Sequence, residues 1–130
     1  MKYGLIMLAF LSTGVFAKNE VTDCESSYKS KLKIESCINK AIETKKRDLR
    51  VVLADVNAVV VGQEEYHISP GLSKEFSLNN KNYKAYLDSF CSLYLGAIGA
   101  NMGTGSVIAS LKCEYIMLDQ RIKALNFITK

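Results

Sequence analysis

The four cysteines of this 130-residue chain constrain its fold more than any other feature. Cys24, Cys37, Cys91 and Cys113 are an even number, they form no C-x-x-C pair, and the chain has a single histidine, so zinc binding lacks the closely spaced ligands it needs. Disulfides persist in oxidising compartments, and a small core gains most from them. We therefore expect two disulfides in an exported protein, with no metal and no other cofactor.

The first 17 residues have the pattern of a secretory signal peptide. A positive start at Lys2 is followed by an apolar stretch from Gly4 to Leu11 and by Val15-Phe16-Ala17, which ends in a small residue. The apolar stretch is shorter than the roughly 20 residues that a membrane-spanning helix needs. Lys18, not a cysteine, comes next, so no thiol is available there for a lipid anchor. We expect cleavage after Ala17, a mature domain of residues 18–130 in the periplasm or secreted, and no stable membrane anchor.

The charge of the mature chain is mild. Removing residues 1–17 removes Lys2 and leaves 16 basic and 13 acidic residues, a formal charge of +3. Nucleic-acid binders concentrate basic residues much more strongly. The densest basic run, Lys45-Lys46-Arg47 with Arg50, is typical of the solvent-exposed side of a helix, so no nucleic-acid partner is expected.

Apolar residues recur at intervals of three and four along most of the mature chain, as in amphipathic helices. The series runs from Leu32 to Val60, and the β-branched run Val59-Val60-Val61 has no second strand with which to pair. Adjacent Pro70 and Gly71 mark the clearest break, within His67–Gly71. The pattern predicts helices near residues 23–31, 35–65, 73–95 and 106–128. We expect an all-α fold in which one long amphipathic helix packs against a C-terminal antiparallel helical hairpin.

Aromatic residues form a stripe along the third expected helix, and glycines follow it. A stripe at helical spacing more often packs in a core than binds a ligand, so we expect it to be buried. The glycine-rich segment Gly96–Gly105 resembles a phosphate-binding loop only superficially, because it lacks the Gly-Lys-Ser/Thr ending and a preceding strand. We expect it to reverse the chain. The stripe comprises Phe76, Tyr83, Tyr86, Leu87, Phe90 and Tyr94.

The positions of the cysteines favour one of the three possible pairings. Cys91 lies eleven residues before Met102 and Cys113 eleven after it, so the two face each other in an antiparallel hairpin centred there. Cys24 and Cys37 would lie about 20 Å apart in one unbroken helix, too far for a disulfide. The prediction is Cys24–Cys37 and Cys91–Cys113, with the chain doubling back near residues 29–33.

Several of these segments together resemble a known family. Tyr83–Cys91 is similar to a W-x-x-Y-R-D-x-x-C helix, Gly103–Ser106 to a glycine turn, and Cys113–Arg121 to a C-x₇-R helix. Upstream, Cys24 and Cys37 with Asp48-Leu49 are similar to C-x₁₂-C and D-x-x-L-N. The chain thereby resembles the lysozyme inhibitor LprI-like family of small exported bacterial proteins, over about residues 24–125. Within the motif, Tyr83, Tyr86, Asp88 and Arg121 are implied to be structural.

The chain departs from the family pattern at four positions. Tyr83 replaces Trp and Leu53 replaces Tyr, which are changes among aromatic or apolar residues. Leu87 replaces Arg and Arg50 replaces Asn, so two polar positions differ. The resemblance therefore implies the fold more directly than the activity.

The resemblance implies a non-enzymatic protein that binds a lysozyme, or another envelope protein, and inhibits lysozyme by protein–protein contact. The alternative is an envelope structural or interaction module without an enzyme target. His67 is expected in a loop, with no nucleophile or orienting carboxylate assigned to it. An acidic patch near Gln63-Glu64-Glu65 could meet a basic lysozyme. A hairpin turn fixed by Cys91–Cys113 would be preorganised, so partner binding is expected at Asn101, Met102, Gly103, Thr104, Gly105 and Ser106.

Overall fold

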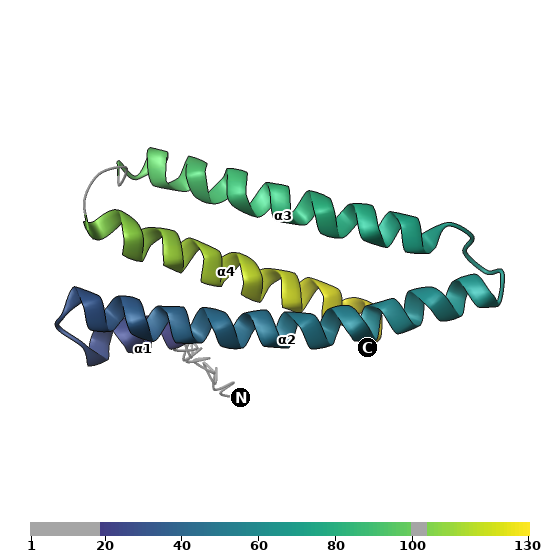
Figure 1. Cartoon of the computed structure of the whole chain (residues 1–130), viewed down its shortest axis with the longest axis horizontal. Coiled ribbons are helices and arrows are strands. Elements are labelled where there is room, and N and C mark those ends of the chain that lie inside the picture. The colour runs from purple at the N-terminus through teal and green to yellow at the C-terminus, as the bar shows by residue number, and fades with distance from the viewer. Residues whose placement is uncertain (1–18, 100–103) are drawn as a thin grey trace, which may run out of the picture.

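The computed structural model describes residues 19–99 and 104–130, so the expected signal peptide lies outside the described residues. All regular structure in the described part is helical, which confirms the all-α prediction (Figure 1). None of these helices is sufficiently long and apolar to cross a membrane. The elements are α1 (Glu20–Ser27), α2 (Lys31–Glu65), α3 (Leu72–Ala97) and α4 (Thr104–Thr129).

The short helix α1 is folded back along the start of α2. Asn19 caps α1, because its side-chain oxygen accepts a hydrogen bond from the backbone N–H of Thr22 at 2.8 Å. The chain then turns between α1 and α2, and the Cys24–Cys37 disulfide joins the two helices with a Cα–Cα distance of 5.7 Å. This confirms both the predicted pairing and the predicted reversal of the chain.

The core lies mainly along the contact between α2 and α4, which we call the α2–α4 seam. Ile38 and Ile42 of α2 pack with Tyr115 and Leu118 of α4, and α1 adds Val21. Complete burial of an isoleucine is worth about 1.5–3 kcal/mol, so this continuous row supplies much of the stability. Further along the seam lies a second buried cluster, made by Val56, Val60 and Leu125.

Leu32 does not join this row, although the apolar spacing assigned it to the buried side. It lies six residues before Ile38, about 120° away around the helix axis, and its side chain is exposed. The side chains that pack on the core therefore begin at Ile34, two residues later than expected.

A polar margin runs beside the apolar seam. Lys45 of α2 donates to the Asp119 carboxylate of α4 at 2.8 Å and lies over the Tyr115 ring, 5.4 Å from its centroid. The hydrogen bond to Asp119 raises the pKa of Lys45. Burial alone raises the pKa of Asp119, but hydrogen bonds from Lys123 and Lys45 outweigh it and bring this pKa below its usual range. These contacts fix the register of α4 against α2.

The connection between α2 and α3 is the predicted break at His67–Gly71. His67 and Gly71 both have positive φ angles, 53° and 83°, which turn the chain sharply. The Glu64 carboxylate caps α3, since it accepts hydrogen bonds from the backbone N–H of Ser73 at 2.8 Å and from the Ser73 hydroxyl. The same hydrogen bonds lower the pKa of Glu64.

The hairpin of α3 and α4 is tied by the predicted Cys91–Cys113 disulfide, with a Cα–Cα distance of 5.7 Å. Both helices extend further into the glycine-rich segment than expected. α3 continues through Gly96 to Ala97, Gly99 has a φ of 70°, and Gly105 already lies in α4.

The aromatic stripe of α3 is only partly buried, which corrects the expectation that it packs in the core. Phe76 contacts the cluster of Val56, Val60 and Leu125, and Tyr83 is half-buried. Tyr86, Phe90 and Tyr94 are instead 57%, 37% and 36% exposed. The reason is that α3 meets only one neighbour on that side, α4, and nothing covers the outer part of the stripe among the described residues (Figure 1).

Candidate functional site

Arg121 of α4 makes a polar bridge to the first half of α3. Its Nη2 donates to the side-chain oxygens of Asn79 and Asn80, at 2.6 Å each, and its guanidinium lies 4.8 Å from the Tyr83 ring centroid. The Tyr83 hydroxyl donates to the backbone carbonyl of Met117 at 2.8 Å. We call this set the Arg121 bridge.

The Arg121 guanidinium in this bridge is held by neutral groups and not by a carboxylate. Within residues 19–99 and 104–130, Arg121 forms no ion pair, and its buried Nε has no hydrogen-bond partner. Burial lowers the pKa of Arg121, and burial raises the pKa of Tyr83 to about 12 against the opposing effect of the arginine charge. The structure thus brings together the motif residues Tyr83 and Arg121, whose contacts join helices.

The bridge divides the space between α2, α3 and α4 into two cavities. One, of about 340 Å³, is mainly apolar and is lined by residues such as Val56 and Phe76. The other, of about 450 Å³, is also lined by leucines but has more charged residues around it, and we call it the charged cleft. Its charged lining residues are Lys46, Lys84, Asp88, Glu114 and Arg121.

Pairing inside the charged cleft neutralises part of its surface. Lys46 contacts Glu114 at 3.1 Å and Glu43 at 3.4 Å, and the hydrogen bond to Glu114 raises the pKa of Lys46. Asp88, the acidic residue among the four motif residues, lines this cleft and is exposed. It forms no ion pair within the part of the chain that the structure describes.

The opposite side of the hairpin carries an apolar groove of about 290 Å³ between α3 and α4, which we call the aromatic groove. The rings of Tyr86 and Phe90 lie 5.7 Å apart, centroid to centroid. Lys112 is the one charged lining residue, and it forms an ion pair with Glu25 of α1 at 2.9 Å. The groove is lined by Tyr86, Phe90, Tyr94, Lys112, Cys113, Ile116, Met117 and Gln120.

The two motif tyrosines, Tyr83 and Tyr86, thus lie on different sides of α3. Tyr83 joins the Arg121 bridge, whereas Tyr86 lines the aromatic groove. Sequence reasoning missed this groove, although one signal was present. Tyr86, Phe90 and Tyr94 recur every four residues, and the charged residues nearest to them in the sequence, Lys84 and Asp88, fall on the other side of α3.

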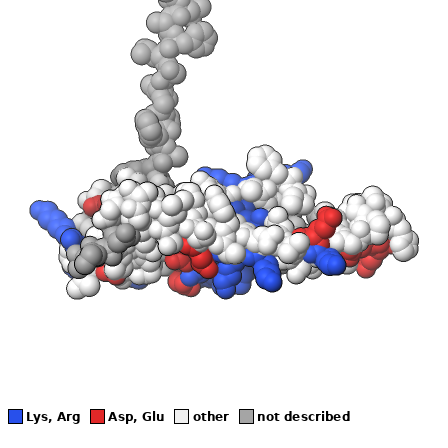
Figure 2. Space-filling view, turned by 90° about the horizontal axis from the view of Figure 1, so that it is seen from above, with Lys and Arg blue, Asp and Glu red and all other residues white. Residues whose placement is uncertain are grey.

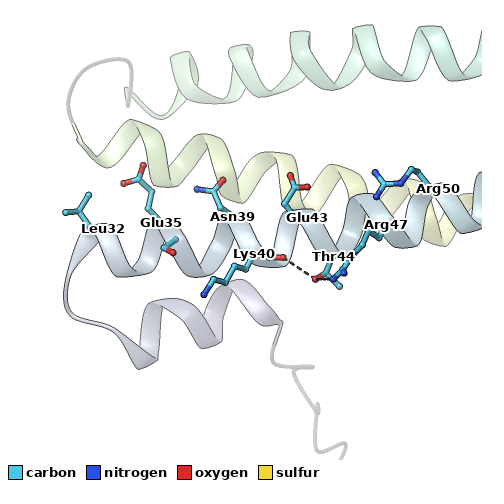
Figure 3. Close-up of a pocket in the computed structure, with 9 residues that line it drawn as sticks. Leu32, Glu35, Asn39, Lys40, Glu43, Thr44, Arg47 and Arg50 are labelled. Atoms are coloured by element: carbon cyan, nitrogen blue, oxygen red, sulfur yellow. Dashed lines mark hydrogen bonds between the residues drawn. The ribbon is translucent and has the colours of Figure 1, made fainter.

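A shallow hollow of about 900 Å³ follows the outer surface of α2 (Figure 3). Its carboxylates are Glu35 and Glu43, eight residues apart and therefore about 12 Å apart along the helix. Glycoside hydrolysis needs two carboxylates about 5–9.5 Å apart on either side of a sugar. One helix surface does not provide that arrangement.

The end of α3 and the start of α4 each carry an exposed apolar side chain. Asn101, Met102 and Gly103 of the expected binding segment lie outside the described residues, while the backbone of 104–106 forms the first turn of α4. On either side of that segment, Ile98 is 49% exposed and Val107 is 42% exposed. We call Ile98, residues 99–106 and Val107 the hairpin tip.

The described residues hold no group of three His, Cys, Asp or Glu side chains placed to bind a metal ion. His67 lies in the α2–α3 turn, where its backbone N–H donates to the carbonyl of Glu64 at 2.9 Å. Comparison with family models, with curated proteins and with solved structures finds no match to this chain. Its function is therefore inferred from the surfaces of the helical hairpin.

Proposed function

We propose that this chain is an exported, non-enzymatic binding domain that inhibits a lysozyme by contact through the hairpin tip. The observation that carries the proposal is the exposure of Ile98 and Val107 beside a connection that the Cys91–Cys113 disulfide holds at its base. Ile98 and Val107 flank this connection in the sequence, and exposed apolar side chains favour contact with another protein. A preorganised tip loses less conformational entropy on binding than a free loop does.

The shape of the molecule supports the choice of the tip. The sides of α2, α3 and α4 are long helical surfaces, whereas the C-terminal end of α3 and the N-terminal end of α4 lie at one end of the molecule (Figure 1). Only an end can enter a sugar-binding cleft. At the other end, the connection between α2 and α3 is held in a compact turn by Glu64 and Ser73.

Apolar contact, more than charge, supports binding at the tip. In the expected acidic patch at residues 63–65, the Glu64 carboxylate is already hydrogen-bonded to Ser73, where it caps α3. The mature chain has a formal charge of +3, which repels a basic lysozyme at long range. Insertion of Ile98 and Val107 needs no such attraction.

Lysozyme as the target, and export, are proposed on the sequence. The resemblance to the LprI-like family suggests the target, and residues 1–17 suggest cleavage after Ala17 and a periplasmic or secreted product. The two disulfides fit an oxidising compartment.

The test is lysis of a cell-wall suspension by a panel of lysozyme types, with and without residues 18–130 in micromolar excess. We expect slower lysis by at least one type. Val107→Asp should weaken inhibition at least about tenfold, because a carboxylate without a partner would be buried in the contact. Val51→Asp is the matched control, since Val51 is 62% exposed on α2 and lies outside the tip.

The outcomes separate the parts of the proposal. Unchanged lysis across the panel would remove lysozyme as the target and favour an interaction module without an enzyme target. Inhibition that is equally strong with Val107→Asp and Val51→Asp would keep the function and exclude the tip as its site.

A further inference from the structure

The aromatic groove has a repeat that suits pairing with its own copy. Tyr86, Phe90 and Tyr94 lie four residues apart and so form one row along α3, of the kind that packs between the rows of a neighbouring helix. Tyr86 and Tyr94 lie about 6 Å along the helix on either side of Phe90. A two-fold axis at Phe90 would bring Phe90 onto the partner's Phe90 and Tyr86 onto the partner's Tyr94.

Charge around the groove favours a like copy over a charged partner. Lys112 is already paired with Glu25, so the lining offers no unneutralised charge to attract a strongly charged protein. Lys84 and Asp88 line the charged cleft on the other side of α3. Seen from the α3 side, the surface over the C-terminal part of α3 is largely uncharged (Figure 2). Two copies would meet there with little repulsion.

The exposed apolar area is sufficient for a weak dimer. Tyr86, Phe90, Leu93, Tyr94 and Ile116 remain between 36% and 68% exposed. From the usual areas of such side chains, their exposed parts sum to about 500 Å² per chain, or about 1,000 Å² for a pair, the lower limit of a specific interface. A free monomer would leave this area in water.

We propose that two copies of this chain associate through the aromatic groove around a two-fold axis at Phe90, with the row of Tyr86, Phe90 and Tyr94 of each copy packed into the groove of the other. The same patch on both copies makes the contact, as in most symmetric dimers. This dimer does not depend on lysozyme as a target or on the hairpin tip as the site of its inhibition.

Sedimentation velocity of residues 18–130, from about 1 to about 500 μM, should show a monomer–dimer equilibrium with a Kd in the micromolar range. Phe90→Glu places two carboxylates against each other at the axis, so it should raise the Kd at least about tenfold. Phe127→Glu is the matched control, because Phe127 is exposed near the end of α4 and does not line the groove. Tyr86→Lys, at a more exposed position, is a second disrupting variant whose fold is checked by circular dichroism.

Cross-linking tests the axis itself. Phe90→Cys should form a disulfide between copies on mild oxidation, since this residue meets its own equivalent. A mixture of Tyr86→Cys and Tyr94→Cys chains should form mixed dimers in preference to like pairs. Monomers at every concentration, or dimers unaffected by Phe90→Glu and Tyr86→Lys, would overturn the proposal. Sedimentation and lysis are separate measurements, so failure of the dimer is distinguishable from failure of lysozyme inhibition.

Discussion

α2 and α3 both pack against α4, but they are held in different ways. α2 contributes a row of fully or nearly fully buried residues, among them Ile38, Ile42 and Val56. α3 contributes one buried residue, Cys91, within its described length. Its other attachments include the half-buried Leu72, Phe76 and Leu87 and the Arg121 bridge, which contains the Tyr83 hydroxyl.

The difference indicates that stability and binding are divided between these two regions. Continuous burial in the seam provides free energy, whereas the separate attachments of α3 fix its position and leave its outer side available. The apolar side chains of the aromatic groove are exposed for this reason. Local stability should therefore be higher in α2 and α4 than in α3.

The first prediction compares one leucine from each region. Leu118→Ala in the seam should lower the free energy of unfolding by about 3 kcal/mol, because Leu118 is 5% exposed and its removal leaves a cavity. Leu78→Ala on α3 should change it by less than about 0.5 kcal/mol, since Leu78 is 55% exposed. Urea unfolding followed by circular dichroism measures both, and similar losses would contradict the division between the regions.

The second prediction removes the covalent attachment of α3. Replacing Cys91 and Cys113 together by serine should lower the free energy of unfolding by about 3 kcal/mol, on the chain-entropy estimate for a loop of this length. Hydrogen exchange should accelerate most in α3, because few buried contacts remain to hold it.

The matched control for this loss is the double serine variant of Cys24 and Cys37. Its chain-entropy cost is similar, but its faster exchange should be confined to α1 and the start of α2. Uniform acceleration in both variants would show that the four helices unfold as one unit.

The helices and disulfides could be predicted from the sequence because they depend on local spacing. Apolar intervals define amphipathic helices, and equal distances from the turn bring Cys91 to Cys113. The burial of α3 could not be predicted in the same way. Periodicity shows that Tyr83 and Tyr86 lie on one helix, but it does not show how many neighbours surround that helix. With α4 and α2 on one side only, Tyr83 is half-buried and Tyr86 is exposed.

The candidate sites depended even more on three-dimensional contacts. Arg121 meets Asn79 and Asn80 from more than 40 residues away, and the motif gave no indication of these partners. The aromatic groove requires α3 and α4 to lie at a particular distance, which the intervals along each helix do not set. The hairpin tip was expected from the turn, but its apolar margins, Ile98 and Val107, were not.

The third prediction concerns the Arg121 bridge. Arg121→Met keeps an apolar stem but removes two hydrogen bonds and the contact with the Tyr83 ring, so it should cost about 2 kcal/mol of stability. Arg121→Lys should recover little, because an ammonium group cannot reproduce the planar geometry of the guanidinium.

Lys123→Met is the control for loss of a positive charge from α4. Lys123 is largely exposed and pairs with Asp119, so its removal should cost less than about 0.5 kcal/mol. Urea unfolding measures all three variants. Equal effects of Arg121→Met and Lys123→Met would show that the bridge does not hold α3.

The smallest effect, Tyr83→Phe, tests the bridge by pH. At pH 7 the loss of the hydroxyl bond to Met117 should cost about 1 kcal/mol. Because burial raises the folded-state pKa of Tyr83 to about 12, above its ordinary value near 10, its contribution is complete below about pH 10 and is lost as pH rises through 12. After allowance for solvent screening, this loss should be about 1–2 kcal/mol in the unmodified protein and absent in Tyr83→Phe. Urea unfolding at a series of pH values should therefore show that the stabilities of the unmodified protein and Tyr83→Phe converge in alkali. The control Tyr86→Phe, at an exposed position, should differ little from the unmodified protein at pH 7. A difference between the unmodified protein and Tyr83→Phe that stays constant with pH would show that α3 does not bury this hydroxyl.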